Sequence, residues 1–194
     1  MFRAAGYKST TDAPAFIRSV GLDAYEYEAG NGLAASETTL SATGDAAREA
    51  GIKMSFHTPY FISLSGVDPE KRLKSIEYIR QSLDAARLLG AGTIVVHSGS
   101  AAKISRGEAM TLAADTLKRT LDAVDTHGVK IGLETMGKKN QLGTLDEVIE
   151  LCRISPAFVP VVDFGHLNAR DCGGVFEAAE DYIRVFDRIG SALG

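Results

Sequence analysis

The chain has 194 residues, of which 45% are hydrophobic and 24% charged, and this composition excludes a disordered or fibrous protein. The net charge of −4 excludes general electrostatic attraction to nucleic acid or to an anionic membrane, so any phosphate binding must be local. We therefore expect a single domain over residues 1–194. Cys152 and Cys172 form no CxxC motif, and neither a signal-peptide pattern nor a membrane-spanning apolar run occurs, which predicts a cytoplasmic protein without a membrane partner.

Short apolar segments alternate with helical patterns along the chain. Glycines occupy four positions where a helix should end in a left-handed residue before the next strand, at Gly21, Gly51, Gly90 and Gly128. Five helical stretches separate the predicted strands, and a sixth follows the last one. The predicted strands cover residues 2–5, 22–28, 52–57, 93–97, 129–135 and 158–164.

Three helix starts are well defined by the sequence. Pro69 follows Asp68 at the beginning of the helix with the clearest apolar stripe. This stripe comprises Leu73, Ile76, Ile79, Leu83 and Ala86. Two capping boxes, Ser105-x-x-Glu108 and Thr144-x-x-Glu147, predict the other two starts.

Alternating strands and helices predict an α/β fold with right-handed crossovers and a parallel sheet. The phosphate-binding patterns GxGxxG and GxxxxGK[ST] are absent from the sequence, which disfavours an open nucleotide-binding sheet. We therefore predict a (β/α)8 TIM-barrel type of fold. About six β-α units are present where a closed barrel has eight, so the barrel is expected to be incomplete in this chain.

Five potential metal ligands lie at or just after the ends of four predicted strands. They are His57, His97, Glu134, Asp163 and His166. The carboxyl ends of parallel strands meet on one face, and imidazole with carboxylate is a ligand set for zinc, manganese and similar divalent ions. The sequence thus predicts a multinuclear metal site. Taken singly, each of these side chains could equally be a satisfied polar residue at a strand end.

Two further groups of charged residues leave more than one interpretation open. Glu26 and Glu28 share one side of their strand; one of them could face the site, although helix-facing or solvent-exposed positions are the expectation. Basic residues in the loops of the same face form a rim that could recognise phosphate, or could simply be solvated. These are Lys103, Arg106, Lys138, Lys139 and Arg170.

Four linked motifs resemble the endonuclease IV family of apurinic-site nucleases, within the xylose isomerase-like barrels. They are HTPYFISLSG from residue 57, VVHSGSA, GLETMGKKNQLGTLDEV and VVDFGH, in the same order and spacing as in the family. The similarity covers roughly residues 50 to 172. The resemblance implies an enzyme that hydrolyses the phosphodiester backbone at abasic sites in damaged DNA.

The resemblance also implies roles for individual residues. Zinc is the expected metal, with manganese or another divalent ion as an alternative: His57, His97 and Glu134 would hold one ion, Glu134 and Asp163 would share a second, and His166 would serve a third. Glu134 is the candidate catalytic residue. Tyr60 and Phe61 would lie on the loop that enters DNA, and the candidate substrate-binding set is Tyr60, Phe61, Lys103, Arg106, Lys138 and Arg170.

Several departures from the family pattern keep alternatives open. Ser98 replaces a usual proline, KKNQLG replaces a glycine-richer stretch, and the ligands that the family draws from its last two strands are missing. We expect either a truncated product or a partial barrel that self-association completes. A metal-dependent sugar isomerase or epimerase of the same barrel group is the alternative function, and a non-catalytic metal or sugar-phosphate binding protein is a third.

Overall fold

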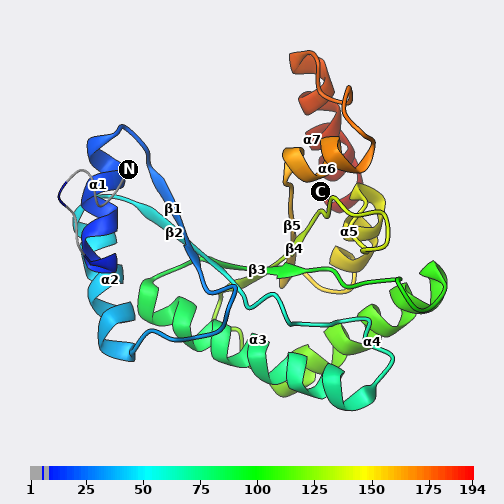
Figure 1. Cartoon of the computed structure of the whole chain (residues 1–194), viewed down its shortest axis with the longest axis horizontal. Coiled ribbons are helices and arrows are strands. Elements are labelled where there is room, and N and C mark those ends of the chain that lie inside the picture. Colours follow the sequence, from blue (N-terminus) through cyan, green and yellow to red (C-terminus); the bar gives the residue numbers. More distant parts are fainter. Residues whose placement is uncertain (1–5, 7–8) are drawn as a thin grey trace.

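The computed structural model describes residue 6 and residues 9–194. Its centre is a curved, five-stranded, fully parallel sheet in which the strands are neighbours in chain order (Figure 1). The strands are β1 (Ala24–Glu28), β2 (Lys53–His57), β3 (Thr93–His97), β4 (Lys130–Glu134) and β5 (Phe158–Val161). Sequential order with parallel pairing is the arrangement of a barrel wall, as predicted. The sheet does not close on itself within the described residues.

Helices connect the strands and cover the sheet. In Figure 1, α3 and α4 run along one side of the sheet, α1 and α2 lie at the β1 end, and α5, α6 and α7 lie at the β5 end. A short 3-10 turn, η2 (Thr10–Asp12), precedes α1. The helices are α1 (Ala13–Ser19), α2 (Glu37–Glu49), α3 (Pro69–Leu89), α4 (Arg106–Ala123), α5 (Leu145–Cys152), α6 (Phe164–Arg170) and α7 (Ala179–Leu193).

Successive side chains of each strand point to opposite faces of the sheet, so that one face packs against the core and the other carries the site. Ile94 and Val96 of β3, and Ile131 and Leu133 of β4, are fully buried among helix residues of the core. Full burial of such a side chain stabilises the fold by about 1.5–3 kcal/mol. The residues that alternate with them therefore belong to the opposite face of the sheet, where the strand-end ligands emerge.

Most predicted boundaries agree with the structure. Gly21, Gly51, Gly90 and Gly128 all have positive φ angles. Both predicted capping boxes are present, since Ser105 and Thr144 accept hydrogen bonds from the third residue of α4 and α5. Asp68 caps α3, as the Asp-Pro pair predicted. The predicted strand at residues 2–5 lies outside the described residues.

Two details differ from the sequence predictions. The last strand ends at Val161 and not at Phe164, because the Asp163 carboxylate accepts a hydrogen bond from the His166 backbone N–H and starts α6. Leu73 was expected in the buried stripe of α3, but it is 50% exposed. It lies in the first turns of α3, before the part of the helix that contributes Ile79 and Leu83 to the core.

Candidate metal centre

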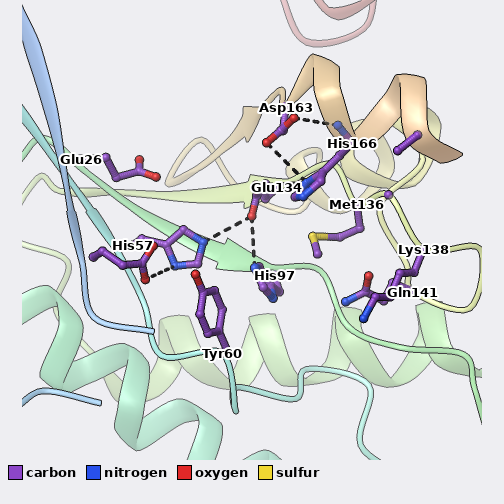
Figure 2. Close-up of a pocket in the computed structure, with 13 residues that line it drawn as sticks. Glu26, His57, Tyr60, His97, Glu134, Met136, Lys138, Gln141, Asp163 and His166 are labelled. Atoms are coloured by element: carbon purple, nitrogen blue, oxygen red, sulfur yellow. Dashed lines mark hydrogen bonds and ion pairs between the residues drawn. The ribbon is translucent and has the colours of Figure 1, made fainter. Parts of the chain in front are cut away.

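The last residues of three adjacent strands supply the centre of the site. His57, His97 and Glu134 end β2, β3 and β4, and His97 is directly paired with Glu134 in the parallel register. Figure 2 shows the two imidazoles and the carboxylate pointing toward one another. The sequence placed these residues at strand ends, and the sheet brings them into one cluster.

Glu134 lies at the middle of this cluster. Its Oε2 atom is 3.5 Å from Nε2 of His57 and 3.3 Å from Nε2 of His97. Its other oxygen, Oε1, is 3.4 Å from Nδ1 of His166. One carboxylate therefore links two groups of potential ligands.

The second group comes from the start of α6. Oδ2 of Asp163 is 3.6 Å from Nδ1 of His166, and the backbone N–H of Asp163 donates to the Thr135 hydroxyl at 2.9 Å. Because Asp163 caps the helix, His166 falls in its first turn and faces β4. Two triads of atoms, each within 4.8 Å of one another, could each hold an ion: His57 with His97 and Glu134, and Glu134 with Asp163 and His166.

Backbone carbonyls orient two of the histidines. Nδ1 of His57 lies 2.9 Å from the Thr58 carbonyl, and Nδ1 of His166 lies 2.9 Å from the Thr135 carbonyl. A carbonyl only accepts, so in each ring Nδ1 carries the proton and donates. In the neutral ring, Nε2 then carries the lone pair that binds a metal ion, which is the usual arrangement of a ligating histidine.

Burial and charge define the electrostatics of the cluster. Burial lowers the pKa of His57, but Glu134, the Thr58 carbonyl and Glu28 outweigh it and raise the pKa to about 8. Burial raises the pKa of Glu134, but the neighbouring imidazoles of His57 and His97 lower it to about 2. Glu134 is thus ionised at neutral pH.

One atom of Glu134 indicates that a cation fits here. Oε2 is buried and makes no hydrogen bond among the described residues, although Nε2 of His57 and Nε2 of His97 lie 3.5 and 3.3 Å away. A divalent ion placed among Oε2 and the two Nε2 atoms would compensate the charge of Glu134. Two imidazoles and a carboxylate are a ligand set that suits zinc and similar ions.

The cluster lies in the wall of an open cavity of about 780 Å³. Glu26 and Glu28 are both solvent-exposed, which was one of the expected positions, and both also line this cavity, where at most one of them was expected to face the site. Oε1 of Glu28 is 3.5 Å from Nδ1 of His57. Side chains alternate between the two faces of the sheet along β1, and Glu28 is paired with His57 of β2. Together, the alternation and this pairing could have assigned both glutamates to the site. Met136 and Gln141 line the cavity too, and sequence reasoning did not select either as a site residue.

Tyr60 covers part of the cluster. Its ring lies over the imidazole of His97, with the ring centroids 5.4 Å apart and an interplanar angle of 28°. A Cβ atom on Gly30 would lie 2.1 Å from Cε2 of Tyr60. The ring can therefore occupy this position because residue 30 has no side chain. Phe61 does not line the cavity and packs against Tyr78, with ring centroids 4.6 Å apart.

The predicted basic residues occupy three kinds of position. Lys138 lines the cavity, whereas Lys103 lines a separate small hollow beside the loops that follow β2 and β3. Arg106 and Arg170 donate hydrogen bonds to carbonyls of the loop after β4. Direct substrate contacts by these residues stay predictions.

Fold and site together define a TIM-barrel-type α/β protein with a candidate metal centre at the carboxyl ends of its strands. The chain belongs to the xylose isomerase-like TIM barrel family, whose sequence pattern matches residues 14–192. The resemblance to endonuclease IV is confirmed as well. The chain is 34% identical over 155 residues to a probable endonuclease 4 of Acholeplasma laidlawii, an alignment that covers 73% of this chain and 51% of that protein.

Solved structures show the same fold. Endonuclease IV of Thermus thermophilus superposes with a TM-score of 0.70 at 23% identity, over 95% of this chain and 63% of that one. D-psicose 3-epimerase of Clostridium cellulolyticum superposes with a TM-score of 0.75 at 16% identity, over 96% and 66%. The chain thus spans between about half and two thirds of the length of these relatives. Among the described residues, no helix is both long and apolar enough to cross a membrane.

Proposed function

We propose that the chain carries the metal centre of a metal-dependent phosphodiester hydrolase that acts on abasic sites in DNA. The observation that carries this proposal is the shared carboxylate of Glu134, whose two oxygens face two different ligand groups. Such sharing suits neighbouring divalent ions, and clustered ions are characteristic of enzymes that hydrolyse phosphodiesters. The similarity to probable endonuclease 4 proteins supports DNA as the substrate.

Each residue of the centre has a proposed part. His57, His97 and Glu134 would hold one ion, Glu134 and Asp163 a second, and His166 a further one. Divalent ions held there supply positive charge to phosphate oxygens and make a water molecule more acidic. Ionised Glu134 supplies negative charge to the cluster before ions bind, and the carbonyls of Thr58 and Thr135 fix the orientation of the His57 and His166 rings. We propose zinc as the ion, because imidazole nitrogens form a large part of the ligand set.

The substrate is proposed to approach over Tyr60. This aromatic ring is 53% exposed at the cavity mouth and could stack on a base or a sugar next to the abasic nucleotide. Phe61, half exposed beside it, would extend the same surface. Lys138 and Lys103 are the candidate phosphate-binding side chains in the loops of this face.

Assembly and location belong to the proposal too. The described residues hold five strands where a closed barrel holds eight, so the remaining wall would come from further chain or from self-association. Light scattering of the purified chain distinguishes a monomer from a self-associated form.

A cytoplasmic location is inferred from Cys152 and Cys172, which are both unpaired.

Cleavage of a duplex with one abasic site tests this function. The zinc-loaded chain is expected to cut the abasic strand and to leave an intact duplex uncut, as read on a denaturing gel. Glu134→Gln should abolish cleavage, while Glu150→Gln, an exposed carboxylate change on α5, should not. Zinc bound at the cluster without any cleavage of abasic DNA would contradict the proposed substrate.

A sugar isomerase or epimerase is the second candidate. Four carboxylates line the cavity, from Glu26, Glu28, Glu134 and Asp163, and such a surface suits a neutral polyhydroxylated ligand better than a polyanion. A metal with flanking carboxylates can move protons on a sugar. Incubation with small aldoses and ketoses, followed by chromatography of the products, separates this function from DNA cleavage.

A further inference from the structure

The loop of residues 136–141 forms one wall of the cavity and is held by two arginines. Nη1 of Arg170 donates to the carbonyls of Met136 at 2.9 Å and Lys138 at 3.0 Å. Nη2 of Arg170 donates to the carbonyls of Lys139 at 3.4 Å and Gln141 at 3.2 Å. One guanidinium group thus binds four carbonyls of a single loop.

Arg106 holds the same loop from the start of α4. Its Nη1 and Nη2 atoms donate to the carbonyls of Lys139 and Gln141, both at 2.9 Å. Glu147 fixes this guanidinium through two contacts, of 2.5 Å to Nε and 2.8 Å to Nη2. Oε2 of Glu147 also accepts from the N–H groups of Gly143 and Thr144, so the network is tied to the start of α5.

The arginines bind the carbonyls of this loop and leave two backbone N–H groups of its cavity-lining residues without a partner among the described residues. The carbonyls point to the arginines, and the N–H groups of Gly137 and Lys138 have no acceptor in the part of the chain that the structure describes. Both residues line the cavity. The Lys138 ammonium likewise forms no ion pair within the described residues, so three donors are free at this wall.

The free donors lie next to the candidate metal centre. A Cβ atom on Gly137 would lie 3.3 Å from the His166 carbonyl oxygen and 3.4 Å from Cδ2 of its ring. Gln141, from the end of the same loop, lines the cavity beside Lys138, as Figure 2 shows. Backbone N–H groups together with a lysine are the donors that bind oxyanions in proteins.

We propose that Arg106 and Arg170 are positioning residues that fold loop 136–141 into an oxyanion-binding surface for a phosphate group of the substrate. The inference deepens the proposed function and rests on it for the identity of the oxyanion. The phosphate contacts come from Gly137 N–H, Lys138 N–H and the Lys138 ammonium. The arginines act through the loop, because Nη1 and Nη2 of both already donate to its carbonyls, and Nε of Arg106 donates to Glu147.

Amide NMR spectra during a titration with inorganic phosphate test this inference. At constant ionic strength, the Gly137 and Lys138 amide signals of the zinc-loaded chain should move with phosphate. Arg170→Gln should weaken the apparent phosphate affinity about tenfold, because the loop loses four hydrogen bonds to a charged group. Arg170→Lys should lose as much phosphate affinity as Arg170→Gln, since one ammonium group cannot replace a guanidinium group that donates to four carbonyls.

The Lys variant separates positioning from direct contact. If Arg170 bound phosphate itself, Arg170→Lys would retain most of the affinity, because lysine binds phosphate as a point charge. Retained affinity in this variant would overturn the inference. Arg184→Gln is the matched control, because among the described residues Arg184 forms an ion pair only with Asp181 on α7, and the phosphate affinity of this variant should equal that of the unmodified chain.

Failure of the metal site and failure of the loop are distinguishable. Zinc content is measured on the same samples, and the titration is repeated after zinc removal. A chain that binds no zinc contradicts the proposed function alone. Gly137 and Lys138 amides that ignore phosphate both with and without zinc overturn the inference. Lys138→Gln, a change in an exposed side chain, must also weaken binding, and unchanged affinity in this folded variant counts against the proposed surface.

Discussion

Oε2 of Glu134 lies 3.3 Å from Nε2 of His97, buried and without a hydrogen bond among the described residues. An ionised carboxylate in this state is costly unless a cation compensates it; protonated His57 does so in the zinc-free chain, and a metal ion would do so in the loaded chain. The same carboxylate reaches His166 through Oε1. This relationship makes Glu134 the residue on which metal binding should depend most.

We predict that the chain binds at least two zinc ions through the triads that share Glu134. Glu134→Gln keeps the size of the side chain but removes its charge, so zinc content should fall below one ion per chain. Plasma mass spectrometry of protein dialysed against zinc and then against buffer measures the content. Glu150→Gln should keep the full content, and an unchanged content in Glu134→Gln would contradict a shared carboxylate ligand.

Stability of the zinc-free chain should decrease as pH rises above neutral. The pKa of His57 is raised from 6.5 to about 8 in the folded chain, so its protonated form stabilises the fold. This contribution is complete below pH 6.5, is lost as pH rises through 8, and amounts to at most about 2 kcal/mol. Urea unfolding of chelator-treated protein at pH 6 and pH 9 measures it.

The acid side of the same profile has the opposite sign. The pKa of Glu134 is lowered from 4.5 to about 2, so its contribution to stability is present above pH 4.5 and is lost as pH falls toward 2.

Two histidine variants test the loss of stability between pH 6 and pH 9. His57→Gln should reduce this loss, whereas His127→Asn, a change at an exposed turn, should leave the loss unchanged. Zinc should bind more tightly as pH rises, because it competes with the proton on His57.

Gly30→Ala should displace the Tyr60 ring from His97. The added Cβ would meet ring atoms of Tyr60 at 2.1 to 2.7 Å, and a half-exposed ring can swing outward. The ring-current shift of the His97 imidazole protons should then disappear in NMR spectra, as it should in Tyr60→Ala. Gly107→Ala, with open space around its Cβ, is the control. An unaltered His97 signal in Gly30→Ala would show that the ring stays in place.

Ser98→Ala should destabilise the fold by about 1 kcal/mol and weaken zinc binding. The buried Ser98 hydroxyl donates to the backbone carbonyl of Glu134 at 2.9 Å, and its removal leaves that carbonyl without this partner. Urea unfolding and zinc titration measure the two effects. Thr111→Ala, an exposed change on α4, should alter neither. A loss of stability with full zinc affinity would restrict Ser98 to a structural role.

Local patterns were sufficient to predict most of the fold. Capping boxes at Ser105 and Thr144 and the glycines before strands act over a few residues, so the sequence defines helix ends directly. Asp163 is the instructive exception. Asp163 is the N-cap of α6, so the extended segment ends earlier than the continuous apolar run suggested. Whether such a residue continues a strand or caps a helix depends on the conformation of the residues that follow it.

The sequence by itself determined the parallel α/β architecture and the candidate ligands, because strand ends in such a sheet must share one face. Only the tertiary structure decided that Glu134 faces two groups of ligands, that Glu26 and Glu28 join the cavity, and that Arg106 and Arg170 hold a loop. These properties depend on side-chain directions and on contacts between residues far apart in the chain, such as His57 with Glu134 and Arg106 with Glu147, which no local pattern encodes.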